Sequence, residues 1–272
     1  MIGLFDSGLG GLTVVARIRE RLPRADIVYF ADQANVPYGD REPDDLYELL
    51  AANLARLDDF GVDAIVMACN TSCAIAERYG WPSTRAPVLD LIDSAATAVQ
   101  RAGHKRIGVV ATTATVSAGS YGRTLRSAVP GAEVWEMAAP ALVPMIEAGC
   151  ISGTRARAEV DAICDALPQD LDAVIYGCTH YPVLDAHFGA ALGSSVALVD
   201  PAVMQAERAA ALVRDREVPD ERGTVRYVTS GDPSVFAAGI VRVTGEAPPR
   251  VEATRSLLKN SRADRFGRRS GG

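Results

Sequence analysis

Short apolar runs rich in β-branched residues alternate with amphipathic stretches along most of this chain. The alternation predicts strands followed by helices, which build parallel sheets with helices on both faces. The runs are apolar at successive positions, as expected for strands buried on both sides. We predict strands at Ile2–Phe5, Ile27–Phe30, Ala64–Met67, Val88–Leu91, Arg106–Val110, Val134–Met137, Ala173–Tyr176 and Val196–Val199, and helices at Leu12–Arg21, Asp44–Phe60, Ala95–Ala102, Tyr121–Ser127, Arg155–Leu167 and Met204–Arg214.

An internal repeat narrows the architecture further. The segment DAIVMACNT at 63–71 recurs as DAVIYGCTH at 172–180, and both copies place a cysteine, Cys69 or Cys178, directly after a strand. Weaker echoes follow in the same order, with 2–7 resembling 107–112 and 25–28 resembling 131–134. We therefore predict an α/β fold of two pseudo-symmetric domains, each a mainly parallel sheet flanked by helices, with the active site between them.

The domain limits follow from the turns and from the end of the repeat. The boundary between the two halves falls near Asp93. A strand candidate at Val225–Val228, beyond the second half, must pack on an existing sheet. We expect the chain to return to its first domain there. The predicted division is 1–93 plus 203–260 for a discontinuous first domain, 94–202 for the second domain, and 261–272 for a flexible basic tail.

Composition excludes several classes of protein. A net charge of −6 disfavours nucleic-acid binding, and no apolar run approaches the length of a membrane helix. The first residues lack the basic start of a signal peptide. Five cysteines without a C-x-x-C pair, and only three histidines, favour reduced thiols in the cytoplasm and argue against a metal site.

The two repeated cysteines fit the chemistry of racemisation. In open α/β sheets ligands bind at the carboxyl ends of the strands, where Cys69 and Cys178 both stand. Two facing thiols allow one base to remove an α-proton while an acid delivers a proton to the opposite face. His180 follows Cys178 closely and could tune it, and Asn70 and Thr71 after Cys69 indicate a helix start, where backbone N–H groups favour negative charge. The other cysteines, Cys73, Cys150 and Cys164, are interpreted as buried structural residues.

Three further segments bear on the site. The glycine-rich stretch 6–13 follows the first strand, where its N–H groups could approach an anion. A dinucleotide-binding loop needs its third glycine where Thr13 stands, so the pattern argues against nucleotide binding. We expect Asp6, at the end of the strand, to relay or position a proton instead. The segment 36–40 is either a surface turn or part of the site. From its neighbours alone, Glu147 is expected to be a solvated helix residue.

Taken together, these motifs resemble those of the glutamate racemase family. They occur in the family's order as DSGLGGLTV at 6–14, PYG at 37–39, ACNT at 68–71, VP at 143–144 followed by Glu147, and GCTHYP at 177–182. Aspartate and hydantoin racemases are siblings that lack the opening motif and the HYP ending. The resemblance assigns Cys69 and Cys178 as the acid–base pair, Asp6 and His180 as their assistants, and substrate binding to Asp6, Ser7, Tyr38, Gly39, Asn70, Thr71, Thr179 and His180, with Glu147 as a weaker match.

The resemblance also implies a function. It is that of a cytoplasmic isomerase that interconverts L- and D-glutamate without a cofactor or metal, supplying D-glutamate for peptidoglycan, cell wall biogenesis and cell shape. No lysine lies in any motif to anchor pyridoxal phosphate. The partner implied is the small-molecule substrate glutamate, with neither nucleic acid nor membrane, and a homodimer is left open.

Two other classes compete with this interpretation. A cysteine hydrolase would use Cys178 as nucleophile and His180 as base, but a spacing of two residues suits that pair poorly and leaves Cys69 idle. A noncatalytic two-lobed binding protein leaves both cysteines unexplained. Exchange of the glutamate α-proton with solvent deuterium is expected of the racemase alone.

Overall fold

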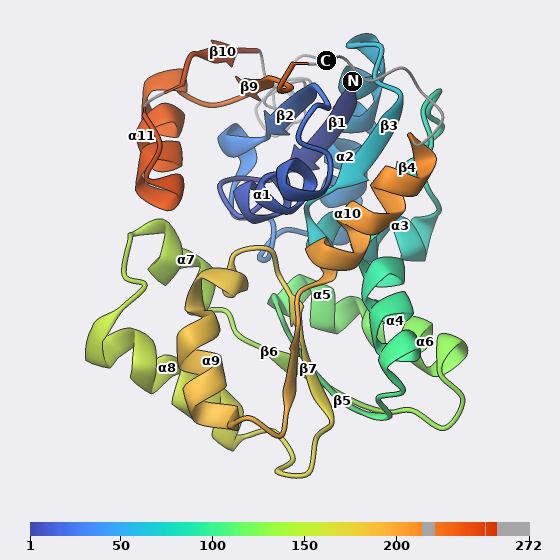
Figure 1. Ribbon diagram of the computed structural model, residues 1–272, viewed down its shortest axis with the longest axis vertical. Helices are drawn as coiled ribbons and strands as arrows, with labels where there is room; N and C mark the ends of the chain where they lie inside the picture. Colours follow the sequence, from blue (N-terminus) through green and yellow to red (C-terminus); the bar gives the residue numbers. More distant parts are fainter. Residues whose placement is uncertain (214–220, 248, 255–272) are drawn as a thin grey trace, which may run out of the picture.

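The computed structural model describes residues 1–213, 221–247 and 249–254, which form two lobes (Figure 1). The first lobe is built on a six-stranded sheet in the order β10-β9-β2-β1-β3-β4, and the second on a four-stranded sheet in the order β6-β5-β7-β8. Every strand pairing in the described residues is parallel. The predicted fold class is confirmed.

The strands of the first sheet are β1 (Ile2–Asp6), β2 (Ile27–Ala31), β3 (Ala64–Met67), β4 (Val88–Leu89), β9 (Val225–Thr229) and β10 (Val251–Ala253). Those of the second are β5 (Arg106–Ala111), β6 (Glu133–Ala138), β7 (Ala173–Gly177) and β8 (Ala197–Val199). Helices of the first lobe are α1 (Leu12–Arg21), α2 (Pro43–Asp59), α3 (Asn70–Tyr79) and α11 (Pro233–Thr244). Helices of the second are α5 (Thr113–Ala118), α6 (Ser120–Ala128), α7 (Leu142–Glu147), α8 (Gly153–Asp165) and α9 (Asp185–Leu192). Helices α4 (Leu91–Ala102) and α10 (Pro201–Leu212) follow the two crossings between the sheets, and short 3-10 turns lie at Gln33–Asn35 and Tyr181–Leu184.

The central strands are buried on both faces, which explains their continuous apolar sequences. Neighbouring residues of one strand enter cores on opposite sides of the sheet: Phe5 packs in one cluster and Leu4 in the other. All five residues of β1 and of β7 are buried. Burial of that kind is typical of parallel sheets covered by helices on both sides.

The internal repeat corresponds to equivalent strands in the two sheets. The order β2-β1-β3-β4 in the first sheet matches β6-β5-β7-β8 in the second, and the repeated segments form β3 and β7. Strand β3 ends beside β1, and β7 ends in the same way beside β5. Each lobe therefore delivers a cysteine to the carboxyl edge of its own sheet.

The structure corrects one predicted boundary. Strand β4 ends at Leu89 and α4 begins at Leu91, so the strand predicted to Leu91 and the helix predicted from Ala95 are both wrong here. The cause is Asp90, whose carboxylate accepts hydrogen bonds from the N–H groups of Ile92 and Asp93 and so caps the helix.

Several elements did not stand out in the sequence. The predicted helix list gives no bounds for α3, although its start at Asn70 is expected, and it omits α5, α7, α9 and α11; α10 begins ahead of its predicted start. The end of that helix at Arg214 and the predicted tail, 261–272, lie outside the described residues. Strand β9 pairs with β2 in the first sheet. The division at 93 and 203 stays a prediction, since α10 contacts strands of both sheets and α4 contacts α3 of the first lobe as well as β7 and β8 of the second.

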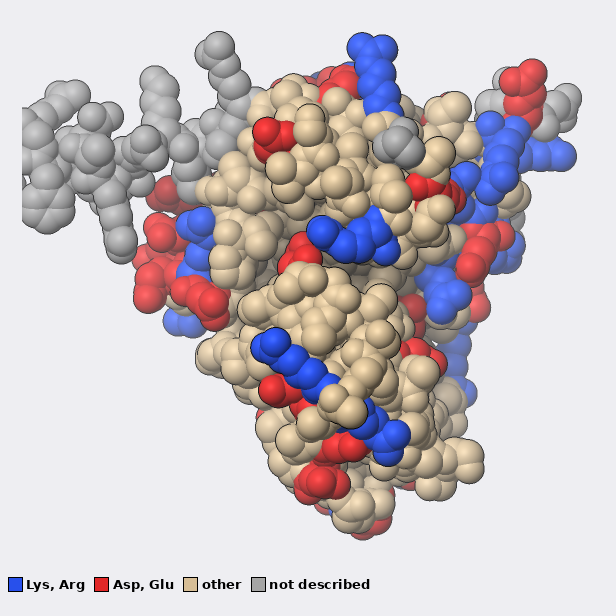
Figure 2. Space-filling view, turned by 90° about the vertical axis from the view of Figure 1, so that its left-hand side faces the viewer, with Lys and Arg blue, Asp and Glu red and all other residues tan. Residues whose placement is uncertain are grey.

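The surface shows mixed charge. On the face drawn in Figure 2, acidic and basic side chains of the described residues lie intermixed, without a broad patch of one sign. Within the same described ranges, no helix combines the length and the apolarity needed to cross a membrane.

Asp90 generates a prediction about stability. Its burial, and then the nearby Asp93, raise the pKa of the Asp90 carboxyl to about 6, against 3.8 ordinarily. Between these pH values the unfolded chain releases a proton that the folded chain keeps, so this group's contribution to stability falls as pH rises. Asp90→Asn keeps an acceptor for the cap but cannot ionise. We expect it to unfold in urea with a free energy about 1–2 kcal/mol above that of the parent at pH 8, and with little difference at pH 3.5, below both pKa values.

Asp232→Asn is the matched control, because Asp232 caps α11 with the same geometry but is exposed. It should show no pH-dependent gain. An Asp90→Asn variant that differs from the parent equally at both pH values would contradict the prediction.

Candidate active site

One pocket lies where the carboxyl edges of the two sheets meet, and both lobes line it. Its wall contains every residue that the sequence motifs single out: Asp6, Ser7, Tyr38, Gly39, Cys69, Asn70, Thr71, Glu147, Cys178, Thr179 and His180. The turn at 36–40, which the sequence left open, is therefore part of this pocket. The structure brings the residues together, while their individual roles are a matter for the proposal below.

Cys69 occupies the N-cap position of α3, directly after β3. Its thiol points to Ser7, with 3.9 Å between Sγ and Oγ. Burial, and then the charge of Asp6, raise the pKa of Cys69 to about 12. The free protein therefore holds Cys69 as a thiol at neutral pH, in the form that can give a proton.

Cys178 follows β7 and has an imidazole beside it. Sγ lies 3.6 Å from His180 Nδ1, and His180 Nε2 lies 2.8 Å from Glu147 Oε1. Burial disfavours the charged imidazolium, but the bonds to Cys178 and Glu147 outweigh it and raise the pKa of His180 well above its usual value. The three side chains form a chain along which a proton can move.

Glu147 is consequently not the solvated helix residue expected from its neighbours. Burial would raise the pKa of its carboxyl, but the bond to His180 outweighs this and lowers it. The two residues stand 33 positions apart and meet because α7 packs against the turn after β7. Their spacing in the sequence carries no sign of this contact.

The Cys178–His180 contact corrects a second expectation. The spacing of two residues predicts a poor pairing, yet Sγ and Nδ1 are in contact because the chain turns sharply after β7. The objection to a hydrolase on grounds of spacing is therefore wrong.

The glycine-rich turn after β1 folds around a carboxylate of the protein itself. Asp6 Oδ2 accepts hydrogen bonds from the N–H groups of Gly11 at 2.7 Å and Gly8 at 3.3 Å. Burial raises the pKa of Asp6, and the charge of His180 opposes the rise. These N–H groups are therefore engaged by Asp6 and do not form an open cradle for an external anion.

Gly10 allows the two lobes to approach closely. A Cβ atom there would overlap with the ring of His180 and lie 2.7 Å from Thr179 Oγ1. Thr13 Oγ1 adds a hydrogen bond of 3.0 Å to the carbonyl of Thr179. Glycine at this position is needed for space, so that the turn after β7 can rest on the turn after β1.

Two polar residues were missed in the sequence, one that lines the pocket and one that holds a residue of its wall. Thr112, at the end of β5, lines the pocket, and its hydroxyl lies 3.0 Å from that of Thr71. The echo of 2–7 in 107–112 aligns it with Ser7 and could have revealed it. Asp32 follows β2, is buried, and accepts a 2.5 Å hydrogen bond from the hydroxyl of Tyr38. An acidic residue at a strand end was the available signal.

Two like α/β lobes that each bring a cysteine motif to a shared pocket define a class to which amino-acid racemases belong. The chain matches the model of the Asp/Glu/Hydantoin racemase family over residues 11–209, and it belongs to that family. It is an amino-acid racemase of the glutamate racemase group, as the motifs predicted.

Relatives and solved structures resemble the chain over most of their length. It is 43% identical to a glutamate racemase of Gloeobacter violaceus over 87% of this chain and 89% of that protein. A glutamate racemase structure from Thermus thermophilus, in complex with β-chloro-D-alanine, is 35% identical, with a TM-score of 0.80 over 93% of this chain and 96% of that one. One from Francisella tularensis, in complex with D-glutamate, is 29% identical, with a TM-score of 0.85 over the same shares.

The Glu147–His180 bond predicts a shift in pH dependence. Glu147→Gln keeps an oxygen near Nε2 but removes the negative charge that favours the imidazolium. The pKa of His180 should fall, and the alkaline limb of kcat/KM, on which His180 loses its proton, should move to lower pH by about one unit. The loss of activity should thus be larger at pH 9 than at pH 7.

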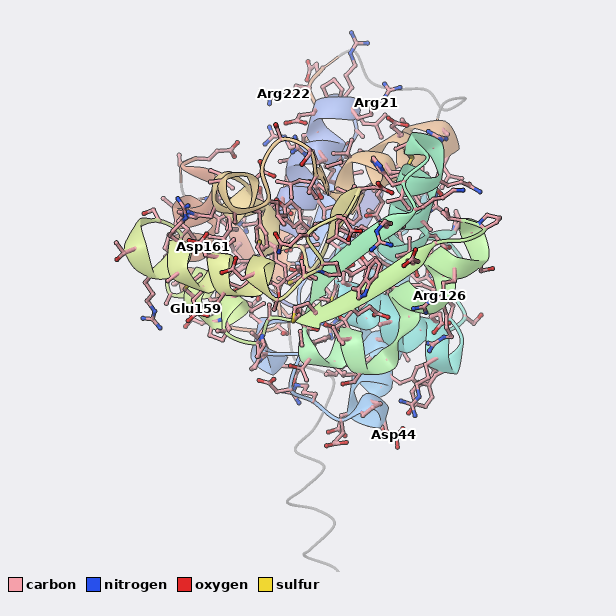
Figure 3. All side chains as sticks on the ribbon, turned by 90° about the horizontal axis from the view of Figure 1, so that it is seen from below. Arg21, Asp44, Arg126, Glu159, Asp161 and Arg222 are labelled. Carbon is pink, nitrogen blue, oxygen red and sulfur yellow. The ribbon has the colours of Figure 1, made fainter. Side chains whose placement is uncertain are left out.

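Glu159→Gln on the outer surface of α8 removes the same charge far from the pocket and serves as control (Figure 3). Its profile should match that of the parent. If the Glu147→Gln profile also coincides with that of the parent, Glu147 does not tune His180.

Proposed function

We propose that this protein interconverts L- and D-glutamate in the cytoplasm by a two-base mechanism without a cofactor, and that the D-glutamate supplies peptidoglycan synthesis. The supporting observation is that Cys69 and Cys178 line one pocket from equivalent strand ends of two like sheets. Because L- and D-glutamate have equal free energy, the enzyme must serve both directions. Two groups of the same chemical type, one on each face of Cα, meet that requirement.

The reaction from L to D begins at Cys178. Its thiolate takes the α-proton of L-glutamate, so an S–H bond forms as the Cα–H bond breaks, and the electron pair remains on the carbanion beside the α-carboxylate. The thiol of Cys69 then delivers its proton to the opposite face of Cα. The product is D-glutamate, with Cys69 left as thiolate and Cys178 as thiol. The D-to-L reaction follows the same steps in reverse.

The neighbours of each cysteine carry its proton between turnovers. His180, held by Glu147, lies within contact of Cys178 Sγ and can exchange a proton with it. On the other side, Ser7 contacts Cys69, and Asp6 carries the charge that acts on it. The remaining polar groups of the pocket wall, Tyr38, Gly39, Asn70, Thr71 and Thr179, are proposed to hold the substrate.

Hydrolysis is the second candidate, because Cys178 and His180 are in contact as a nucleophile and base would be. It gives no role to Cys69, which lines the same pocket with a thiol of raised pKa. The two reactions differ at the α-carbon, since a hydrolase leaves the Cα–H bond intact.

Substrate choice provides the first test. We expect the protein to racemise glutamate at least about 100-fold faster than aspartate. A site sized for the glutamate side chain leaves polar groups unpaired when the carboxylate of the shorter side chain falls a methylene short. Circular dichroism with each enantiomer measures the rates, and mass spectrometry in D2O measures exchange at Cα. Comparable rates of racemisation with aspartate would contradict the proposed preference for glutamate. Absence of exchange on both amino acids would exclude racemisation.

The two cysteines should not be interchangeable. Cys69→Ser and Cys178→Ser should each abolish racemisation, because an alcohol is a far weaker acid than a thiol. A glutamate analogue with a leaving group on its side chain needs proton removal from one face only. Cys69→Ser should therefore still eliminate from the L-analogue, and Cys178→Ser from the D-analogue.

Cys150→Ser, at a half-buried thiol outside the pocket, is the matched control and should keep full racemase activity. If the Cys69 and Cys178 variants fold but each loses elimination from the L-analogue and the D-analogue equally, the two-base geometry is contradicted.

A further inference from the structure

Only one of the two polar atoms of the Asn70 side chain has a hydrogen-bond partner among the described residues. Asn70 begins α3 directly after Cys69, lines the pocket and is 3% exposed. Its Oδ1 accepts a hydrogen bond of 2.6 Å from the hydroxyl of Tyr121. Its Nδ2 is buried and has no hydrogen-bond partner among the described residues. A buried amide nitrogen is costly to leave unpaired, which marks this atom for a ligand that carries an acceptor.

The partner of Asn70 comes from the other lobe. Tyr121 lies on α6, is fully buried, and makes no other hydrogen bond within the described part of the chain. Helix α6 is anchored on α3 beside it: Ser120 Oγ donates to the carbonyl of Ala74 at 3.2 Å, and Arg123 donates to Glu77 at 3.0 Å. The tyrosine hydroxyl is thereby held at a set place against the amide.

Counting hydrogen-bond partners decides which way the amide faces. A tyrosine hydroxyl has a single proton, which here reaches Oδ1 of Asn70. With the amide reversed, Nδ2 would donate to the hydroxyl, and the proton of that hydroxyl would be buried without an acceptor. The observed orientation leaves one orphan atom instead of two, and that atom is a donor.

We propose that Tyr121 is a positioning residue, which holds the Asn70 amide so that Nδ2 donates a hydrogen bond to a carboxylate oxygen of the substrate. The inference rests on the proposed function, because it takes the ligand of this pocket to be an amino acid. An N–H donor selects a carboxylate and cannot bind an ammonium group. Since Tyr121 and Asn70 belong to different lobes, the donor is aligned only while the lobes are docked.

Tyr121→Phe removes the hydroxyl and little else. The amide is then free to turn, and the contact with the substrate carboxylate is lost for part of the time. We expect KM for glutamate to rise about ten-fold with kcat changed by less than about three-fold, since the contact is the same in the bound substrate and in the transition state. Tyr176→Phe is the matched control, because Tyr176 is equally buried but its hydroxyl donates to Asp185. That variant should keep the parent KM.

A double-mutant cycle separates positioning from a general structural effect. Asn70→Ala should raise KM by itself, and adding Tyr121→Phe to it should change KM by less than about two-fold, because the hydroxyl acts only through the amide. An equal rise in KM in both backgrounds would overturn the inference. So would a Tyr121→Phe variant with the parent KM.

A second variant tests the donor role even if Tyr121→Phe does not fold. In Asn70→Asp, Tyr121 donates to one oxygen and the other oxygen meets the substrate carboxylate, so KM should exceed that of Asn70→Ala by about ten-fold. A KM below that of Asn70→Ala would show that this position accepts a hydrogen bond from the ammonium group, and would overturn the inference. A parent protein that leaves glutamate unchanged would instead overturn the proposed function itself.

Discussion

The site depends on the contact between the turn after β7 and the glycine-rich turn after β1. His180 and Thr179 rest on Gly10 with no room for a side chain between them, and Thr13 bonds the carbonyl of Thr179 across the same seam. Glu147 reaches this seam from α7 and carries the charge that His180 needs. If the lobes separated here, the pocket would lose one wall and the chain from Glu147 to Cys178 would lose its enclosure. Tight packing across this seam is therefore a condition for the chemistry as well as for stability.

Pseudo-symmetry of the backbone is combined with asymmetry of charge. The two cysteines end equivalent strands, yet Cys69 is near a hydroxyl and a buried carboxylate, whereas Cys178 is near an imidazole paired with a carboxylate. Burial with a negative neighbour favours the thiol on one side. An adjacent imidazole gives the other side a partner for its proton. A reaction that needs one acid and one base at a time can use that difference in the resting protein.

Several polar groups buried between the two lobes form hydrogen bonds with a residue of the opposite lobe. The hydroxyls of Thr71 and Thr112 meet from opposite lobes, as do those of Thr71 and Thr115. Tyr121 and Asn70 form a further pair of this kind. Because a buried polar atom is costly without a partner, such pairs hold the lobes in one arrangement. The same arrangement leaves Asn70 Nδ2 open for a ligand.

The sequence was sufficient to predict the parallel α/β class, the two like halves and the two site cysteines. Continuous apolar strands and the two copies of the repeat can each be recognised within a short segment of the chain. It also contained the strand-end signal of Thr112. It misplaced the start of α4, since a side-chain cap at Asp90 ended a run that otherwise reads as strand. It indicated a helix start at Asn70 and Thr71, directly after Cys69, and α3 begins there.

The environment of each cysteine arose from contacts between residues far apart in the chain. Glu147 reads as a surface residue until α7 is docked against His180, and Tyr121 reads as helix core until α6 meets α3. Desolvation, which raises the pKa of Cys69, exists only once both lobes cover it. Periodicity and motifs specify which residues can do the chemistry, because they act through local geometry. Burial and pairing set the protonation of those residues, and both arise only when the two sheets are brought edge to edge.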